Sequence, residues 1–432
     1  MRILIVTLLL SSMVWAQSAA TALDQGQYEE AWRLYQAELA ASPDKLDALA
    51  GGSEALLNLG RAEEALALAN RACRLTPNDP ACLAQRAEIL GVLERPQEAL
   101  QDLDRAIALA PDAPYLYLAR GYAYADLGEF PESVADQTRV ITLEPTNALA
   151  YAGRAYARAQ LGEIDEAFQD VATSLKLAPE LVPAIHTRAD LFFRRARYVE
   201  ALNDYDRAIA LDGTEPFLFA GRAGVKASLN QLEAALEDYN RAIELAPNRP
   251  ALYSERGNLL AVMGRMEDAL KDHNTAVGLS PNSPDPLVAR GQFFLDWERA
   301  ERALQDFNEA IRVDPTMGEG YLGRGETYLA IGQPDQALGD LNKAVELSPA
   351  LLYAYTARAR AFEAKGDKER AFQEYSDLLK TTPTFSPALL GLGYLQLEKG
   401  DSRAARKSFE AALEHASTPD LMSEARAAIS DL

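Results

Sequence analysis

The sequence predicts an all-α fold built as a linear array of repeated helix pairs. Three observations predict it: proline recurs every 34 residues, apolar residues follow helical spacing within each period, and glycine marks a fixed point in most periods. A constant period of this length is typical of stacked repeats, each of which buries its apolar face against its neighbours. The prolines are Pro43, Pro77, Pro111, Pro145, Pro179, Pro247, Pro281, Pro315, Pro349 and Pro383, and the one gap falls at Gly213, where the count stays in phase.

The copy that starts at Gly318 shows how one unit divides into two helices. Tyr321 and Tyr328 are seven residues apart and share one helical face. Gly332 then ends the helix, because a C-cap favours a residue that tolerates left-handed backbone. In the second helix the position of Ala337 is alanine in ten of eleven units, which lets the two helices approach closely. The other units with glycine or asparagine at the turn have Gly60, Gly128, Gly162, Asn230, Gly264, Gly366 and Gly400.

Counting back from the prolines gives eleven full units over residues 46–419. Residues 17–45 form a partial N-terminal repeat, and residues 420–432 form a C-terminal capping helix that closes the apolar end of the array. The units start at Leu46, Pro80, Pro114, Ala148, Val182, Pro216, Pro250, Pro284, Gly318, Leu352 and Ser386.

Residues 1–16 have the features of a secretory signal peptide. Arg2 precedes an apolar run from Ile3 to Leu10, and Ala16 provides a small residue at the cleavage point. The run is shorter than the roughly 20 residues that span a bilayer. We expect a mature chain from near Gln17 that is periplasmic or secreted, without direct membrane insertion. The alternative is an N-terminal capping helix.

The unit pattern resembles the tetratricopeptide repeat (TPR). The resemblance rests on an aromatic at position 4, Gly or Ala at 8, Tyr at 11, Ala at 20, an aromatic at 24, Ala at 27 and Pro at 32. It covers nearly the whole mature chain. It implies a right-handed superhelical solenoid of antiparallel helix pairs whose first helices line a concave groove. It also implies a binding scaffold that is not an enzyme.

The motifs that commonly signal catalysis are explained by the repeat. Gly318, Gly320 and Gly323 spell a GxGxxG, but a helix precedes them where a dinucleotide site needs a strand. The three histidines, His186, His273 and His415, lie in separate units. We therefore expect no catalytic residues, no metal site and no cofactor.

Arginine at position 7 and an acid at position 23 recur together in nine consecutive units. Arg324 and Asp340 are one such pair. Both positions are equidistant from the turn, so the antiparallel helices bring them to one level, and we expect a ladder of charge-assisted hydrogen bonds. A basic stripe for an acidic ligand is the alternative.

Cys73 ends the second helix of one unit and Cys82 begins the next. Both lie at the same inter-repeat turn, and an exported chain allows a disulfide between them. In the other units the position that corresponds to Cys73 is Ile, Val or Leu, so a buried free thiol is the alternative.

The groove positions give the functional prediction. In the resembled family the exposed positions of the first helix are 2, 5, 9, 12 and 13, and members that bind chaperone tails hold Lys and Asn there; position 5 here lacks that clamp. Exposed aromatics and arginine are common anchors of binding surfaces. The predicted partner-binding residues are Tyr115, Tyr122, Tyr156, Phe193, Arg194 and Phe217. Packing between repeats is the alternative role for each of them.

The sequence thus predicts an exported scaffold that binds a peptide or helix of another protein. The net charge of -21 disfavours nucleic acid and favours a basic or apolar partner. Polysaccharide binding through the same aromatics is the alternative function.

Overall fold

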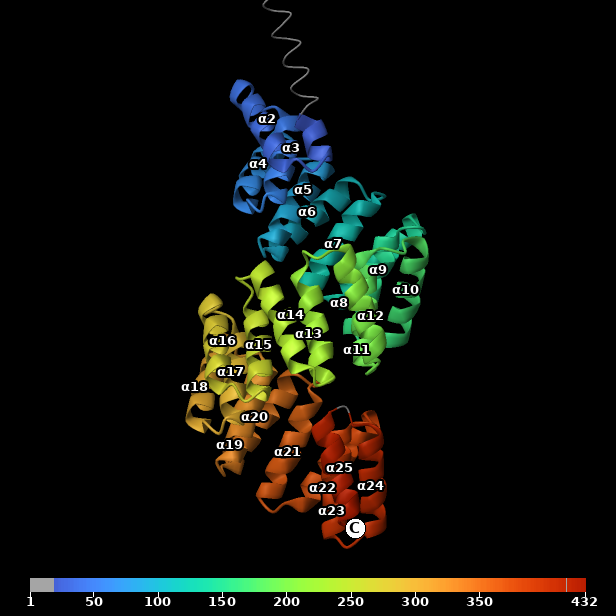
Figure 1. Ribbon diagram of the computed structural model, residues 1–432, viewed down its shortest axis with the longest axis vertical. Coiled ribbons are helices and arrows are strands. Elements are labelled where there is room, and N and C mark those ends of the chain that lie inside the picture. The colour runs from blue at the N-terminus through green and yellow to red at the C-terminus, as the bar shows by residue number, and fades with distance from the viewer. Residues whose placement is uncertain (1–18, 417) are drawn as a thin grey trace, which may run out of the picture. The chain divides into compact units, whose positions relative to one another are not determined.

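The computed structural model describes residues 19–416 and 418–432, and every regular element in these ranges is a helix. The chain divides into two compact units, one ending at Asp212 and the other starting at Gly213 (Figure 1). The predicted all-α array of antiparallel helix pairs is confirmed. The predicted signal peptide, residues 1–16, and its cleavage point near Gln17 lie outside the described residues.

In the first unit each helix packs on the next one in the chain. Residues 19–24 are helical and precede the first complete helix. The complete helices are α2 (Tyr28–Ala41), α3 (Leu46–Asn58), α4 (Ala62–Leu75), α5 (Pro80–Val92), α6 (Pro96–Leu109), α7 (Pro114–Asp126), α8 (Phe130–Leu143), α9 (Ala148–Gln160), α10 (Ile164–Leu177), α11 (Val182–Arg194) and α12 (Tyr198–Leu211).

The second unit continues the same pattern of helix pairs. Its helices are α13 (Pro216–Ser228), α14 (Leu232–Leu245), α15 (Pro250–Val262), α16 (Met266–Leu279), α17 (Pro284–Asp296), α18 (Ala300–Val313), α19 (Gly318–Ala330), α20 (Pro334–Leu347), α21 (Leu352–Ala364), α22 (Lys368–Thr381), α23 (Ser386–Glu398), α24 (Ser402–Glu414) and α25 (Pro419–Ser430).

The first helix of every pair begins at the residue from which its unit is counted. Proline is the first helical residue of α5, α7, α13, α15 and α17, where its missing N–H costs no intrahelical hydrogen bond. The C-terminal helix begins at Pro419, one residue before the predicted start. The helix of the partial repeat begins at Tyr28, because Gln27 is its N-cap.

The turn inside each pair always contains one residue in the left-handed conformation. Eight of these residues are glycines, including Gly26 of the partial repeat. Asn230 is a ninth, as its tolerance of this conformation predicts. The remaining three, which sequence patterns do not single out, are Glu94, Ala196 and Glu298. The geometry of the pair therefore imposes the turn even where the side chain disfavours it.

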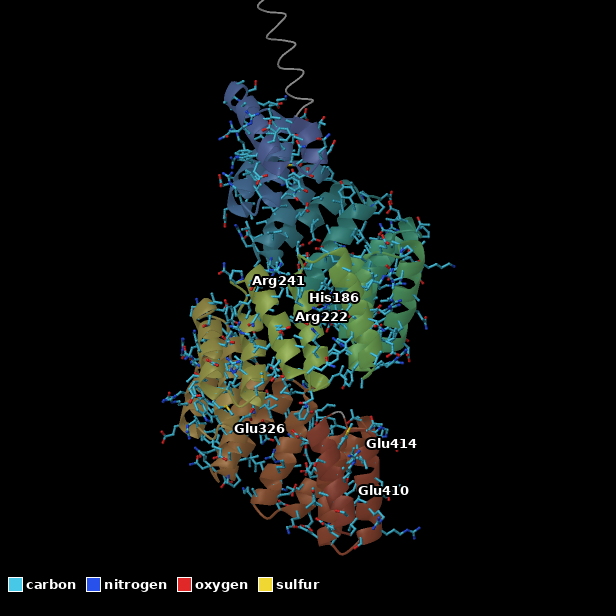
Figure 2. The ribbon with its side chains drawn as sticks, in the orientation of Figure 1. His186, Arg222, Arg241, Glu326, Glu410 and Glu414 are labelled. Atoms are coloured by element: carbon cyan, nitrogen blue, oxygen red, sulfur yellow. A yellow bond between two sulfur atoms is a disulfide. The ribbon has the colours of Figure 1, made fainter. Side chains whose placement is uncertain are left out.

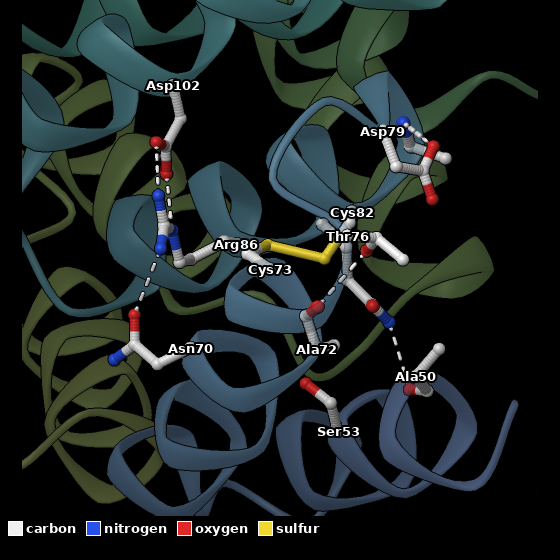
Figure 3. The surroundings of a disulfide bond; sticks show 12 residues. Ala50, Ser53, Asn70, Ala72, Cys73, Thr76, Asp79, Cys82, Arg86 and Asp102 are labelled. Carbon is white, nitrogen blue, oxygen red and sulfur yellow. Dashed lines mark hydrogen bonds and ion pairs between the residues drawn. A yellow bond between two sulfur atoms is a disulfide. The ribbon is translucent and has the colours of Figure 1, made fainter. Parts of the chain in front are cut away.

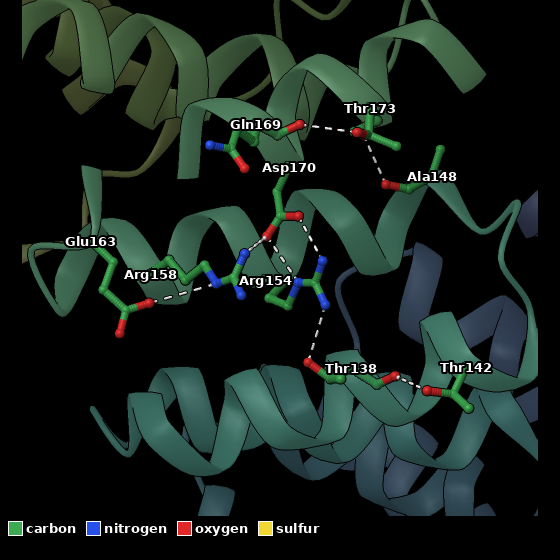
Figure 4. A network of polar contacts seen from close by, with 10 residues as sticks. Thr138, Thr142, Ala148, Arg154, Arg158, Glu163, Gln169, Asp170 and Thr173 are labelled. Carbon is green, nitrogen blue, oxygen red and sulfur yellow. Dashed lines mark hydrogen bonds and ion pairs between the residues drawn. The ribbon is translucent and has the colours of Figure 1, made fainter. Parts of the chain in front are cut away.

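The predicted ladder of arginine and acid is confirmed in all nine repeats. In the pair drawn in Figure 4, Nε and Nη2 of Arg154 donate to the two carboxylate oxygens of Asp170 at 2.8 and 2.7 Å. The third nitrogen, Nη1, donates to Thr138 Oγ1 on α8 at 3.2 Å, so the arginine also ties its repeat to the preceding one. The pairs are Arg86–Asp102, Arg120–Asp136, Arg154–Asp170, Arg188–Asp204, Arg222–Asp238, Arg256–Asp272, Arg290–Asp306, Arg324–Asp340 and Arg358–Glu374.

Short helical segments cover the apolar ends of the described chain. At the N-terminal end, Ala19 and Ala22 pack with Ala31 of α2. At the C-terminal end, Ala425 and Ala428 of α25 complete a cluster with residues of α23 and α24. These contacts bury side chains that a further repeat would otherwise cover.

Candidate functional site

A large groove opens on the first helices of three successive repeats in the first unit. It is lined mainly by α3, α5 and α7 and has a volume of about 1080 Å³. Its lining includes positions 2, 5, 9, 12 and 13 of these repeats, as shown by Ala81, Ala50, Glu88, Leu57 and Asp126. The groove thus lies on the face that the family resemblance assigns to binding.

Small side chains make this groove deep. Ala50 and Ala84 occupy position 5 on α3 and α5, where a larger residue would fill the space between the helices. Gln85 bridges the two helices by donating from Nε2 to the Ala50 carbonyl at 3.0 Å. The floor reaches the buried side chains of Ile89 and Leu103. An apolar concavity of this size is typical of a site that takes a ligand.

A disulfide joins Cys73 and Cys82 beside the groove (Figure 3). Their Cα atoms are 5.7 Å apart, a separation that suits such a bond. The bond connects the last turn of α4 to the first turn of α5, and Cys82 itself lines the groove. It therefore links α5, one wall of the groove, to the neighbouring helix α4.

Tyr115 and Tyr122 both lie on the α7 wall of the groove. Tyr115 is 47% exposed and Tyr122 is 37% exposed, which is high for large aromatic side chains. The hydroxyl of Tyr122 donates to the Leu149 carbonyl at 3.3 Å. Burial raises the pKa of Tyr122 to about 12, so the group stays a neutral hydrogen-bond donor. The two predicted residues are thus brought together.

The other predicted partner-binding residues of the first unit lie outside this groove. The ring of Tyr156 packs edge-on against Phe130 with centroids 6.3 Å apart, and burial raises its pKa. Phe193 packs against Tyr198 at 5.9 Å. Arg194 donates to the Ala159 carbonyl at 2.8 Å and to Gln160 at 2.9 Å. The contacts of Tyr156 and Arg194 join neighbouring repeats, as their alternative role of packing between repeats requires. The contact of Phe193 with Tyr198, in contrast, lies within one repeat.

Phe217, the remaining predicted residue, belongs to the second unit. Its ring is 45% exposed, and the guanidinium of Arg249 lies over it at 5.2 Å. The second unit also has a smaller hollow of about 360 Å³, lined by residues such as Pro250, Ser254 and Glu255. Phe217 does not line that hollow.

Aromatic residues alone do not identify the groove in the sequence. Its lining also includes the non-aromatic residues Leu46, Glu54, Leu57, Glu88 and Leu118. The positional pattern contains the missing signal, because each of these residues except Leu46 occupies position 5, 9 or 12 of a first helix. Small residues at position 5 of two successive repeats mark where the groove deepens.

His186 and the GxGxxG lie in ordinary structural positions. His186, which is labelled in Figure 2, lies on α11. Its Nε2 atom is 3.5 Å from a carboxylate oxygen of Asp190. Gly318, Gly320 and Gly323 are all inside α19, and a Cβ on Gly323 would lie 2.2 Å from the Phe307 ring. No cluster of three potential metal ligands occurs among the described residues.

Comparison with known proteins identifies the repeat. A family model described as "Tetratricopeptide repeat" matches residues 18–80, 85–148, 288–351 and 322–384, and a second of that description matches residues 386–417. A model described as "TPR repeat" matches residues 225–264. A search of curated proteins gave no match.

A solved structure agrees with this fold. The crystal structure of the yeast Tom70 aligns with a TM-score of 0.53 and 17% sequence identity, covering 98% of this chain and 96% of that chain. Within the described residues, no helix has the length and apolar character needed to cross a membrane. The repeat models span more than half of the sequence, and the chain belongs to the tetratricopeptide repeat family.

Proposed function

We propose that this protein is a non-catalytic scaffold that holds a peptide or helix of a partner protein in the groove over α3, α5 and α7. The observation that carries the proposal is the combination of a deep apolar groove with two half-exposed tyrosines on the first helices of TPR units. Apolar area that is left open to water on a folded surface favours a partner that covers it.

The bottom of the groove is suited to side chains of an amphipathic segment. Leu57, Leu118 and Ile89 offer apolar contacts, and the same lining includes two tyrosines and several carboxylates. A combination of apolar and polar groups is common in protein interfaces. Aromatic residues provide contact area with few rotatable bonds, which limits the entropy lost on binding.

Photo-crosslinking from the groove tests this function. A photoreactive residue at Leu118 should cross-link one partner segment, and a synthetic peptide of that segment should bind the purified chain. Replacing Tyr115 and Tyr122 together by alanine should weaken that binding by about tenfold or more, as loss of aromatic anchors does. Circular dichroism should show unchanged helicity.

Tyr353→Ala with Tyr394→Ala is the matched control. Both tyrosines are comparably exposed, but they lie on α21 and α23 in the second unit. The control should bind the peptide as the unmodified chain does. Equal loss in both double variants would contradict a site in this groove, and displacement by oligosaccharides instead of peptides would favour polysaccharide binding.

We also propose that the protein is exported, to the periplasm or outside the cell. The support is the leader-like segment of residues 1–16 together with the disulfide geometry of Cys73 and Cys82. Disulfides persist in oxidising compartments and are rare in reducing ones.

A further inference from the structure

The groove over α3, α5 and α7 contains two carboxylates with no cation beside them. Glu54 on α3 and Glu88 on α5 hold the same position in consecutive repeats and line the same groove. Among the described residues neither carboxylate has an ion-pair partner or accepts a hydrogen bond. No Lys, Arg or His is found among the described residues that line the groove.

The two carboxylates repel each other, and although both residues are exposed to water, no cation among the groove-lining residues offsets this repulsion. Burial raises the pKa of Glu88, and the negative charge of Glu54 raises it further. Like charges that share a site disfavour the ionised state, whereas a nearby cation favours it. A cation supplied from outside would therefore interact favourably with both groups.

Several carboxylates elsewhere in the array have partners of their own. Asp102, in the same unit, accepts two hydrogen bonds from Arg86. In the second unit Glu363 accepts a hydrogen bond from the Tyr375 hydroxyl at 2.8 Å. Glu326 on α19, labelled in Figure 2, lies 3.7 Å from Arg360. The unpaired state of Glu54 and Glu88 thus distinguishes this groove from these other sites.

We infer that the groove takes an apolar segment of a partner protein that carries a lysine or arginine, with that cation between Glu54 and Glu88. The apolar residues of the segment contact Leu57, Leu118 and Tyr122. This inference rests on the proposed function and specifies the chemistry of its ligand. The net charge of -21 adds long-range attraction for a basic segment and raises its association rate.

Designed peptides of one length and one apolar pattern test the inference on the full chain. Three fluorescent amphipathic peptides, built from leucine with lysine, glutamine or glutamate, are titrated and their Kd values compared. The Leu/Lys peptide should bind at least about tenfold more tightly than the Leu/Gln peptide, because close charge pairs at interfaces contribute strongly. The Leu/Glu peptide should bind most weakly.

Paired variants separate a local effect from the total charge of the protein. Glu54→Gln with Glu88→Gln should remove the advantage of the Leu/Lys peptide. The control, Glu132→Gln with Glu166→Gln, changes the net charge equally at exposed sites on α8 and α10, away from the groove. It should change the Kd of the Leu/Lys peptide less than about twofold, as screened surface charges do.

The outcomes separate this inference from the function on which it rests. If Leu/Lys and Leu/Gln peptides bind equally and both lose affinity with Tyr115→Ala and Tyr122→Ala, the groove binds peptides but the cation preference is wrong. If both glutamate double variants lose the same affinity for the Leu/Lys peptide, the inference is overturned, because the attraction is then a non-specific effect of the total charge. Absence of peptide binding at this groove overturns the inference and counts against the proposed function.

Discussion

His273 is a polar side chain at a core position that neighbouring repeats fill with Tyr239 and Phe307. It is fully buried, its ring lies 4.9 Å from that of Phe293, and neither ring nitrogen has a hydrogen-bond partner within the described structure. Gln137 is a second such case, buried at the same position of another repeat without side-chain hydrogen bonds. Such groups lose their hydration on folding without compensation.

We expect His273→Phe to stabilise the protein and to change its pH dependence. Burial lowers the pKa of His273 from 6.5 to about 4, so between these values the unfolded chain binds a proton that the folded chain does not. Stability should therefore fall as the pH falls from 6.5 towards 4, by up to about 3 kcal/mol from this group. At pH 7, removing the unpaired ring nitrogens should add about 1 kcal/mol.

Thermal unfolding of both proteins between pH 7 and pH 4 measures this effect. Carboxylates titrate in the same pH range in both proteins and contribute equally to both. The difference between the two curves of stability against pH therefore measures the contribution of His273. That difference should widen as the pH falls. A constant difference across the range would mean that His273 is protonated in the folded protein or is not buried.

At the scale of the helix pair, at least seven of the nine ladder arginines also donate a hydrogen bond to the preceding repeat and so hold a first helix to the second helices on both sides of it. Arg256 donates to both carboxylate oxygens of Asp272 and, through Nη1, to Asn240 of the preceding repeat at 2.7 Å. The Asp272 hydrogen bonds raise the pKa of Arg256 and keep it charged. The Asp272 side chain is only 7% exposed, so it depends on this cation.

Arg256→Leu should destabilise the second unit by about 3 kcal/mol, because it leaves a buried carboxylate without its partner. Adding Asp272→Leu should recover most of that loss, since apolar replacement of a whole buried pair is often close to neutral. Urea unfolding of the two variants gives the comparison. If the double variant is no more stable than the single one, the contacts of the pair stabilise the repeat in their own right.

The ladder also shows what sequence patterns can and cannot predict about an element. Its pairing follows from two positions equidistant from a turn, so it was predictable from spacing. The third hydrogen bond, as from Arg256 to Asn240, was not, because it depends on how one repeat packs on the next. The left-handed turn residues Glu94, Ala196 and Glu298 were also beyond prediction, since local preference opposes the conformation that the helix pair requires.

At the scale of the whole molecule, the repeat determines the architecture, and departures from it determine the candidate site. Periodicity predicted where each first helix begins because all units obey the same packing rule. The groove depends instead on which residues stand at particular positions of two repeats: Ala50 and Ala84 leave space, and Glu54 and Glu88 both line it. Tyr115 and Tyr122 were predicted from their aromatic character, but the depth beside them required the structure.

Export of the whole chain should have two linked covalent consequences. The full sequence, expressed in a bacterium that secretes proteins, should yield a mature chain that starts near Gln17. Its Cys73 and Cys82 should resist alkylation until a reductant is added, because the nine-residue separation and the 5.7 Å Cα distance suit a disulfide in an oxidising compartment.

The matched control lacks residues 1–16 and stays in the cytoplasm, where both thiols should be alkylated without reductant. Intact mass and non-reducing peptide mapping measure cleavage and bond together. An exported chain that keeps residues 1–16 would contradict the predicted signal peptide but not the disulfide. A cleaved chain with two free thiols would instead support the buried-thiol alternative for Cys73, and the α4–α5 connection would then depend on packing without a covalent link.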